Sequence, residues 1–113
     1  MGEKDRLRAI KKHLAALARQ EGKRQVPFDC GTKWWFASIT DPRTGSPFTY
    51  TGSWDFVAEQ LEQVGTKIDE IALSDPPGKK AYVLRVPTKE CVIYIKVHFG
   101  FGGDIIIGRS FHS

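Results

Sequence analysis

Six polar side chains in the last third of the chain are predicted to share one face of a sheet. They comprise two cations, two imidazoles, a phenol and a hydroxyl: Arg85, Tyr94, Lys96, His98, Ser110 and His112. Guanidinium and ammonium groups bind phosphate, whereas imidazole and phenol groups transfer protons. The alternative interpretation is a solvated surface without chemistry, since antiparallel sheets often expose one side to water.

Three short strands are predicted to position these side chains. They are rich in Val, Ile and aromatic residues and are bounded by Pro or Gly, and they span Ala81–Val86, Cys91–His98 and Asp104–Phe111. The links between them have the lengths of hairpin loops, which predicts an antiparallel meander.

The register of the meander follows from the loops. A loop over Pro87–Glu90 places Val86 opposite Cys91. The second face is then apolar apart from one hydroxyl and should pack on helices; it carries Tyr82, Leu84, Val86, Cys91, Ile93, Ile95 and Val97. With His98 opposite Asp104, Arg109 falls on the side away from the polar face, beside Ile105, Ile107 and Phe111.

Two helices are predicted upstream. Glu3–Glu21 has an apolar stripe at Leu7, Ile10, Leu14 and Leu17, and Gly22 follows it. Ser53–Val64 has a stripe at Trp54, Val57, Leu61 and Val64, with Ser53 as its N-cap.

The remaining segments are predicted with less regular structure. Lys33–Thr40 and Ser46–Thr51 are expected to be strands around a turn at Asp41–Gly45, and Asp75–Gly78 to be a second turn. Thr66–Ser74 fits neither period well and is expected to be a helical turn or a linker. Five aromatic side chains between the two helices favour a satellite core over base stacking: Trp34, Trp35, Phe36, Phe48 and Tyr50.

Length and composition indicate one domain, residues 1–113, with the 41% hydrophobic and 27% charged content of an ordinary globular protein. The sequence contains no apolar run of the ~18 residues that a membrane helix needs, and its charged N-terminus is unlike a secretory signal, so we expect a cytoplasmic protein without a membrane partner. Cys30 and Cys91 are expected to be free buried thiols.

Charge is distributed unevenly along the chain. The net charge is +4 overall, +5 over residues 1–24, −5 over residues 41–75 and +4 over residues 76–113. Basic ends favour a nucleic acid or an acidic protein as partner.

The sequence contains no cofactor-binding motif. Gly100, Gly102 and Gly103 lie between two strands and therefore indicate a turn, and the three histidines lack the spacing of metal ligands. We therefore expect neither a cofactor nor a metal.

The polar face suits metal-independent RNA cleavage, in which a base, an acid and phosphate-binding cations are needed. His112 and Tyr94 would transfer protons, and Arg85 and Lys96 would bind the phosphate.

The C-terminal segments Val92–Val97 and Ile105–His112, and the helical segment Leu7–Leu14, resemble MqsR-family toxins. The resemblance implies a RelE-like α+β fold of the BECR group, mRNA cleavage and neutralisation by an antitoxin. Tyr94 matches the family's active-site tyrosine, and His112 its terminal catalytic Lys or His. A further active-site lysine and a glutamine of the family have no counterpart in this chain.

The expected fold is therefore α+β, with both helices packed on a twisted antiparallel sheet centred on the C-terminal meander. The expected function is an endoribonuclease toxin, with Lys79, Lys80, His98 and Arg109 as further RNA-binding residues. Two alternatives remain open at this stage. One is a non-catalytic RNA- or protein-binding module that uses the same basic surface, and the other is a structural or regulatory subunit whose aromatic hairpin contacts a partner.

Overall fold

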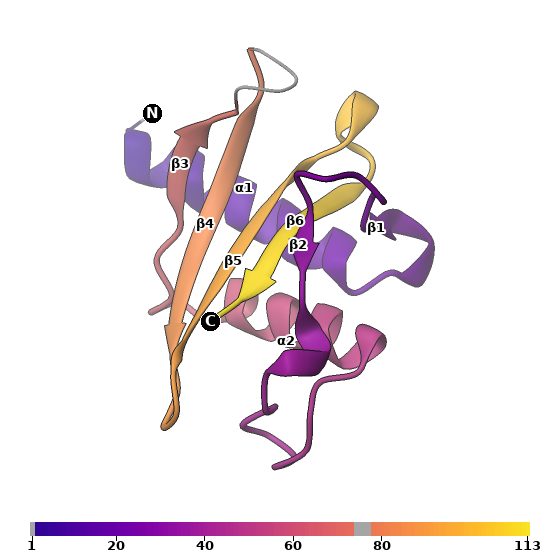
Figure 1. The fold of residues 1–113 in the computed structure, drawn as a ribbon. Helices are drawn as coiled ribbons and strands as arrows, with labels where there is room; N and C mark the ends of the chain where they lie inside the picture. The colour runs from indigo at the N-terminus through magenta and orange to yellow at the C-terminus, as the bar shows by residue number, and fades with distance from the viewer. Residues whose placement is uncertain (1, 74–77) are drawn as a thin grey trace.

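A computed structural model describes residues 2–73 and 78–113 and confirms the α+β class (Figure 1). In these ranges two α-helices and six strands follow one another: α1 (Glu3–Ala18), β1 (Arg24–Gln25), β2 (Lys33–Trp34), α2 (Tyr50–Glu62), β3 (Asp69–Ala72), β4 (Lys80–Pro87), β5 (Val92–Phe99) and β6 (Ile106–His112). None of the helices in the described ranges is long and apolar enough to cross a membrane.

The sheet is mixed rather than wholly antiparallel. Its order is β1–β6–β5–β4–β3, and β2 also pairs with β6. The C-terminal strands β4, β5 and β6 form the predicted antiparallel meander, but β1 and β2 run parallel to β6. The last strand of the chain is therefore an interior strand, paired on both edges, which anchors the C-terminus.

The β4–β5 hairpin is two residues out of the predicted register. Val86 pairs with Ile93, and the loop comprises residues 88–91. The Thr88 side chain closes this loop, since its Oγ1 accepts a hydrogen bond from the Cys91 amide at 3.1 Å and donates one to the Cys91 carbonyl at 2.9 Å. A shift of two residues leaves every side chain on its predicted face.

A β-bulge in β6 overturns part of the prediction for that strand. Lys96 pairs with Ser110 but the next residue, Val97, pairs with Gly108, so Arg109 is an extra residue. The bulge reverses the alternation of side chains on the turn-proximal half of β6. As a result Ile106, not Ile105 or Ile107, is fully buried in the core, and Arg109 lies on the polar face beside His98.

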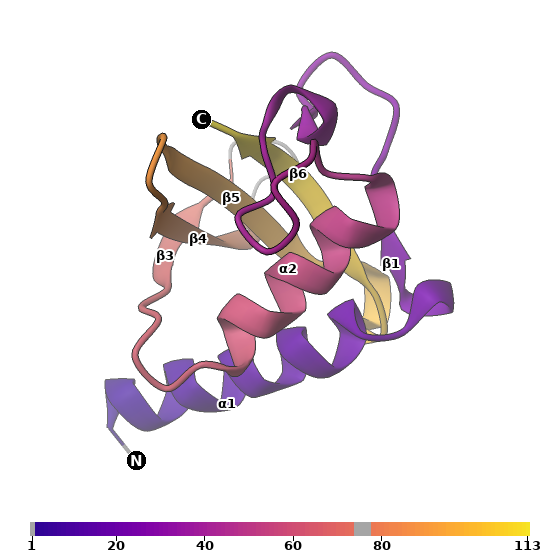
Figure 2. The same cartoon turned by 90° about the horizontal axis from the view of Figure 1, so that it is seen from below.

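Both helices cover the same face of the sheet, as Figure 2 shows, and the core lies between them and the meander. The predicted apolar face is buried as expected, apart from the half-buried Cys91. Leu14 and Leu17 of α1, with Trp54, Val57 and Leu61 of α2, supply the helical side of the core. Val83 and Ala81 are buried too, but they lie outside this cluster because they belong to the opposite face.

The second helix begins three residues earlier than predicted. Thr49, not Ser53, is its N-cap, and the Thr49 hydroxyl accepts a hydrogen bond from the Gly52 amide at 2.9 Å. Ser53 instead lies inside the helix and is fully buried. Its hydroxyl accepts a 2.9 Å hydrogen bond from the Trp34 indole and donates one to the Tyr50 carbonyl, so it joins β2 to α2.

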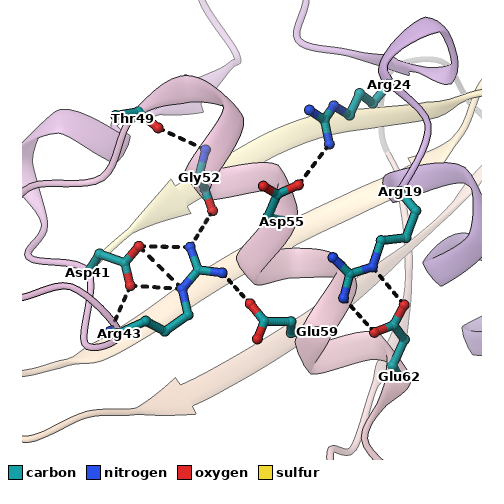
Figure 3. A network of polar contacts seen from close by, with 9 residues as sticks. All are labelled: Arg19, Arg24, Asp41, Arg43, Thr49, Gly52, Asp55, Glu59 and Glu62. Atoms are coloured by element: carbon teal, nitrogen blue, oxygen red, sulfur yellow. Dashed lines mark hydrogen bonds and ion pairs between the residues drawn. The ribbon is translucent and has the colours of Figure 1, made fainter.

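An arginine joins the turn before α2 to that helix (Figure 3). Arg43 contacts both carboxylate oxygens of Asp41, the Gly52 carbonyl and the Glu59 carboxylate. Burial opposes ionisation of Asp41, but the hydrogen bonds from the Arg43 side chain and backbone outweigh it and lower the pKa of Asp41. The turn itself is the predicted one, with the Gly45 amide 2.9 Å from the Asp41 carbonyl.

Other predicted boundaries are wrong. The segment expected as a strand over Lys33–Thr40 forms a strand at Lys33–Trp34 and then a short 3-10 turn at Phe36–Ser38. Ser46–Thr51 contributes a single bridge, between Pro47 and Thr40, while the ambiguous segment 66–74 contains β3. The turn predicted at Asp75–Gly78 lies mostly outside the described residues. Cys30 is exposed, contrary to expectation, and both cysteines are free.

Candidate functional site

Three candidate catalytic side chains form one row across the sheet. Arg85 on β4 pairs with Tyr94 on β5, and Tyr94 pairs with His112 on β6. The Tyr94 and His112 rings are stacked, with centroids 5.3 Å apart and planes 27° apart. The Arg85 guanidinium carbon lies 5.5 Å from the centre of the Tyr94 ring, close enough for a cation–π contact. A cation, a phenol and an imidazole are thus contiguous.

The row lies on the sheet face that the helices leave open. Arg85 is exposed, while Tyr94 and His112 are half-buried. The fourth candidate, Lys96, is half-buried one row along the same face, where it pairs with Ser110. The placement of Ser110 and His112 on this face is therefore as predicted.

Arg85 is held from the neighbouring strand. Its Nη1 donates to the Asp69 carboxylate of β3 at 3.0 Å. Both side chains are about half exposed, so this ion pair contributes little to stability. Its effect is to orient the guanidinium over Tyr94 while leaving other N–H groups for an anion.

An aromatic side chain that sequence reasoning assigned to a satellite core belongs to this site. Trp35 is 53% exposed, and its ring centroid lies 5.6 Å from that of His112. The Trp35 amide donates to the Phe111 carbonyl at 2.8 Å, which extends the β2–β6 pairing to this residue. The Lys33 ammonium lies 5.8 Å from the centre of the Trp35 ring. The signal was present in the sequence: adjacent residues of a strand point to opposite faces, so Trp34 and Trp35 cannot both be core.

His98 is engaged within the protein. It is only 5% exposed; its Nε2 accepts a hydrogen bond from Arg109 Nε at 3.0 Å, which places the proton on Nδ1, 2.8 Å from the Phe99 carbonyl. Burial lowers the pKa of His98, and the cations Arg109, Lys79 and Lys96 lower it further, against the opposing effect of the Phe99 hydrogen bond. His98 is therefore a neutral imidazole that holds Arg109, and it lies away from the row.

Arg109 joins β6 to the segment between β1 and β2. Its Nη1 donates to the Asp29 carboxylate at 2.7 Å and lies 3.4 Å from the Thr32 hydroxyl. Hydrogen bonds from Thr32 and then from Arg109 lower the pKa of Asp29. Two of the three guanidinium nitrogens of Arg109 are thus used internally, which leaves little of it for a substrate.

The remaining predicted RNA-binding residues are not brought to the row. Lys79 and Lys80 lie at the far end of β4, five to six residues from Arg85, a separation of roughly 16–20 Å along a strand. Lys79 is near His98, whereas Lys80 is near Glu70, which Arg6 of α1 contacts on the helical side. The two neighbouring lysines are thus divided between the two faces of the sheet.

The geometry supports acid–base chemistry at a bound anion. His112 and Tyr94 present proton-transferring groups side by side, and Arg85 and Lys96 supply positive charge from adjacent strands. In residues 2–73 and 78–113, His, Cys, Asp and Glu side chains form no group of three or more that could hold a metal ion. Comparison of the chain with known protein families, curated proteins and solved structures finds no match.

Proposed function

We propose that this protein is a metal-independent endoribonuclease that cleaves RNA through attack of a ribose 2′-hydroxyl on the adjacent phosphate. The observation that supports this function best is the row of Arg85, Tyr94 and His112 at directly paired positions on the open face of the sheet. The reaction needs a base, an acid and a stabilised phosphate, and these side chains are of the types that provide them.

The steps balance without a co-reactant. A base removes the 2′-hydroxyl proton, the 2′-oxygen bonds to phosphorus, and the bond from phosphorus to the 5′-oxygen breaks as an acid protonates that oxygen. The products are a 2′,3′-cyclic phosphate and a free 5′-hydroxyl. His112 and Tyr94 are the proton-transferring pair, and Arg85 and Lys96 stabilise the charge that builds on the phosphate.

The biological setting that we propose rests on the resemblance of the C-terminal strands to MqsR-family toxins. In that setting the protein acts on cytoplasmic RNA and is neutralised by an antitoxin. Growth arrest on expression, relieved by a protein encoded in the adjacent reading frame, is the expected phenotype.

The decisive assay is cleavage of a short single-stranded RNA in the presence of EDTA. The intact protein should produce cyclic-phosphate ends, and RNA with 2′-deoxy sugars should resist. His112→Gln should reduce the rate by roughly 10²–10⁴-fold, the usual contribution of a general acid or base, without changing the melting temperature. Removal of the last two residues should have the same effect, while Tyr94→Phe should retain part of the activity.

A matched control is available on the other side of the molecule. His13 is exposed on α1, so His13→Gln makes the same chemical change away from the row and should leave cleavage unchanged. Equal rates for His112→Gln and the intact protein would show that the row is not the active site.

One observation favours a second function, binding of single-stranded RNA without cleavage. Exposed Trp35, with Lys33 beside it, has the character of a base-stacking platform. If this is the function, RNA should be bound with strong salt dependence but remain intact, and Trp35→Ala should weaken binding while His112→Gln should not.

A further inference from the structure

A concave surface lies on the helical side of the protein, away from the row. It is a groove of about 690 Å³ between the N-terminal half of α1, the end of α2 and the connection from α2 to β3. In Figure 2 this connection passes beside the first turns of α1. The volume is within the range of ligand sites, roughly 300–1,000 Å³.

The floor of the groove is aliphatic. Ala15, Leu61 and Ile68 are at most 5% exposed and belong to the core. Leu7, half-buried, and Val64, fully exposed, add apolar surface above them. A fully exposed valine beside an open apolar groove is a feature that a binding partner would cover.

The rim is basic. Five of the residues that line the groove are cations: Lys4, Arg8, Lys11, Lys12 and Lys67. The lining includes one acidic residue, Glu62, whose carboxylate is held by Arg19 at 2.7 and 2.8 Å. The groove therefore presents excess positive charge around an aliphatic floor.

Lys11 keeps the groove in shape. Its ammonium donates to the carbonyls of Gln63 and Thr66, at the end of α2 and in the connection that follows. Two of the other rim cations make longer contacts, with Arg8 3.9 Å from Asp5 and Lys67 4.0 Å from Asp69. The groove is thus preformed, and most of its rim charge is available to a partner.

We propose that this groove binds an acidic amphipathic segment of a partner protein, with aliphatic side chains on the floor and carboxylates against the rim. Charge complementarity selects an acidic occupant. An aliphatic floor without aromatic residues offers no stacking surface for RNA bases, and a recessed floor suits an inserted segment better than a flat lipid surface. The proposal does not depend on ribonuclease activity.

A peptide library displayed on phage, selected against the intact protein, tests this directly. Enriched peptides should combine Asp and Glu with Leu, Ile or Val at spacings of three and four residues, the pattern of a helix bound in a groove. The affinity of an enriched synthetic peptide should fall at least tenfold from low to high salt. A peptide of the same composition in scrambled order should bind at least tenfold more weakly.

Substitutions at the groove locate the site. Val64→Glu places a carboxylate at a fully exposed position without disturbing the core, and it should reduce peptide affinity at least tenfold, as should Lys12→Glu. Lys89→Glu, in the exposed β4–β5 loop, makes the same charge change elsewhere and should have little effect.

Three results would overturn the proposal: enriched peptides without acidic residues, affinity unchanged by both groove substitutions, or a preference of the groove for anionic phospholipid vesicles or RNA over the peptide. Because the peptide assay measures binding alone, its outcome is independent of RNA cleavage. Peptide binding without RNA cleavage would contradict only the proposed ribonuclease, and RNA cleavage without peptide binding would contradict only the proposed groove.

Discussion

Gly108 of β6 is the position where the smallest change should have a large effect. It faces the core beside Trp34, and a Cβ added there would lie 2.6, 2.8 and 3.0 Å from three atoms of the indole six-membered ring. Trp34 cannot retreat cheaply, because it stacks on Trp54 at 4.7 Å and is hydrogen-bonded to Ser53. Gly108→Ala therefore forces either the indole or the strand to shift.

The expected magnitude follows from two opposing effects. Overpacking a core costs about 1–3 kcal/mol, whereas replacing a strand glycine by alanine stabilises by roughly 0.5–1 kcal/mol. The net loss should be about 1–2 kcal/mol, which lowers the melting temperature by roughly 5–10 °C for a domain of this size.

A double-mutant cycle with Trp34→Phe separates the steric effect from backbone propensity. Phenylalanine lacks the outer edge of the indole, which is the part nearest Gly108. In that background Gly108→Ala should be neutral or slightly stabilising, which gives a coupling energy of about 1–3 kcal/mol between the two sites. Urea denaturation followed by far-UV circular dichroism measures all four proteins. An equal cost of Gly108→Ala in both backgrounds would refute the steric explanation, and so would a stabilising effect in the native sequence.

Two further predictions concern α2 and the turn that precedes it. Thr49→Ala removes the N-cap and should cost about 0.5–2 kcal/mol, with Thr49→Ser close to the native stability; a cost for alanine below about 0.3 kcal/mol would contradict the cap assignment. Because the folded pKa of Asp41 lies below its unfolded value of about 3.9, its contribution is present above that pH and is lost as pH falls through the folded pKa. Asp41→Asn should therefore cost about 1–3 kcal/mol at neutral pH and less in acid, measured by denaturant titration; a cost independent of pH would contradict the ionised pair.

Hydrophobic alternation was sufficient to predict the meander and the two faces of β4 and β5. The Val, Ile and Leu side chains at every second position of β4 and β5 lie on the same face of the sheet, which is the face that packs on the helices. An error of two residues in the predicted register leaves them on that face. The parallel pairing of β1 and β2 with β6 was not predictable in this way. These strands have two residues each, too few to show a period, and they form because β6 offers an open edge.

The aromatic segment shows the limit of reasoning from residue type. Trp34, with 8% exposure, and Phe48, with 3%, are core residues as expected. Trp35 and Tyr50 are 53% and 42% exposed, although they are aromatic residues like the two that are buried. Trp34 and Trp35 differ because neighbouring residues of a strand point to opposite faces, and tertiary contacts such as the Trp34–Ser53 hydrogen bond hold Trp34 on the core side.

The bulge at Arg109 determines the composition of the candidate site. Without an extra residue, the alternation that places Ser110 and His112 on the open face would place Arg109 and Ile107 on the core face, as the sequence suggested. One unpaired residue lets Phe111 and Ile106 both face the core although they are five positions apart, and it turns Arg109 toward His98. The guanidinium that alternation would bury is thus paired with Asp29 at the surface, and the open face keeps His112 beside Tyr94. A bulge leaves no mark in hydrophobic periodicity except the break that it causes, here the Gly108-Arg109-Ser110 interruption between two apolar stretches.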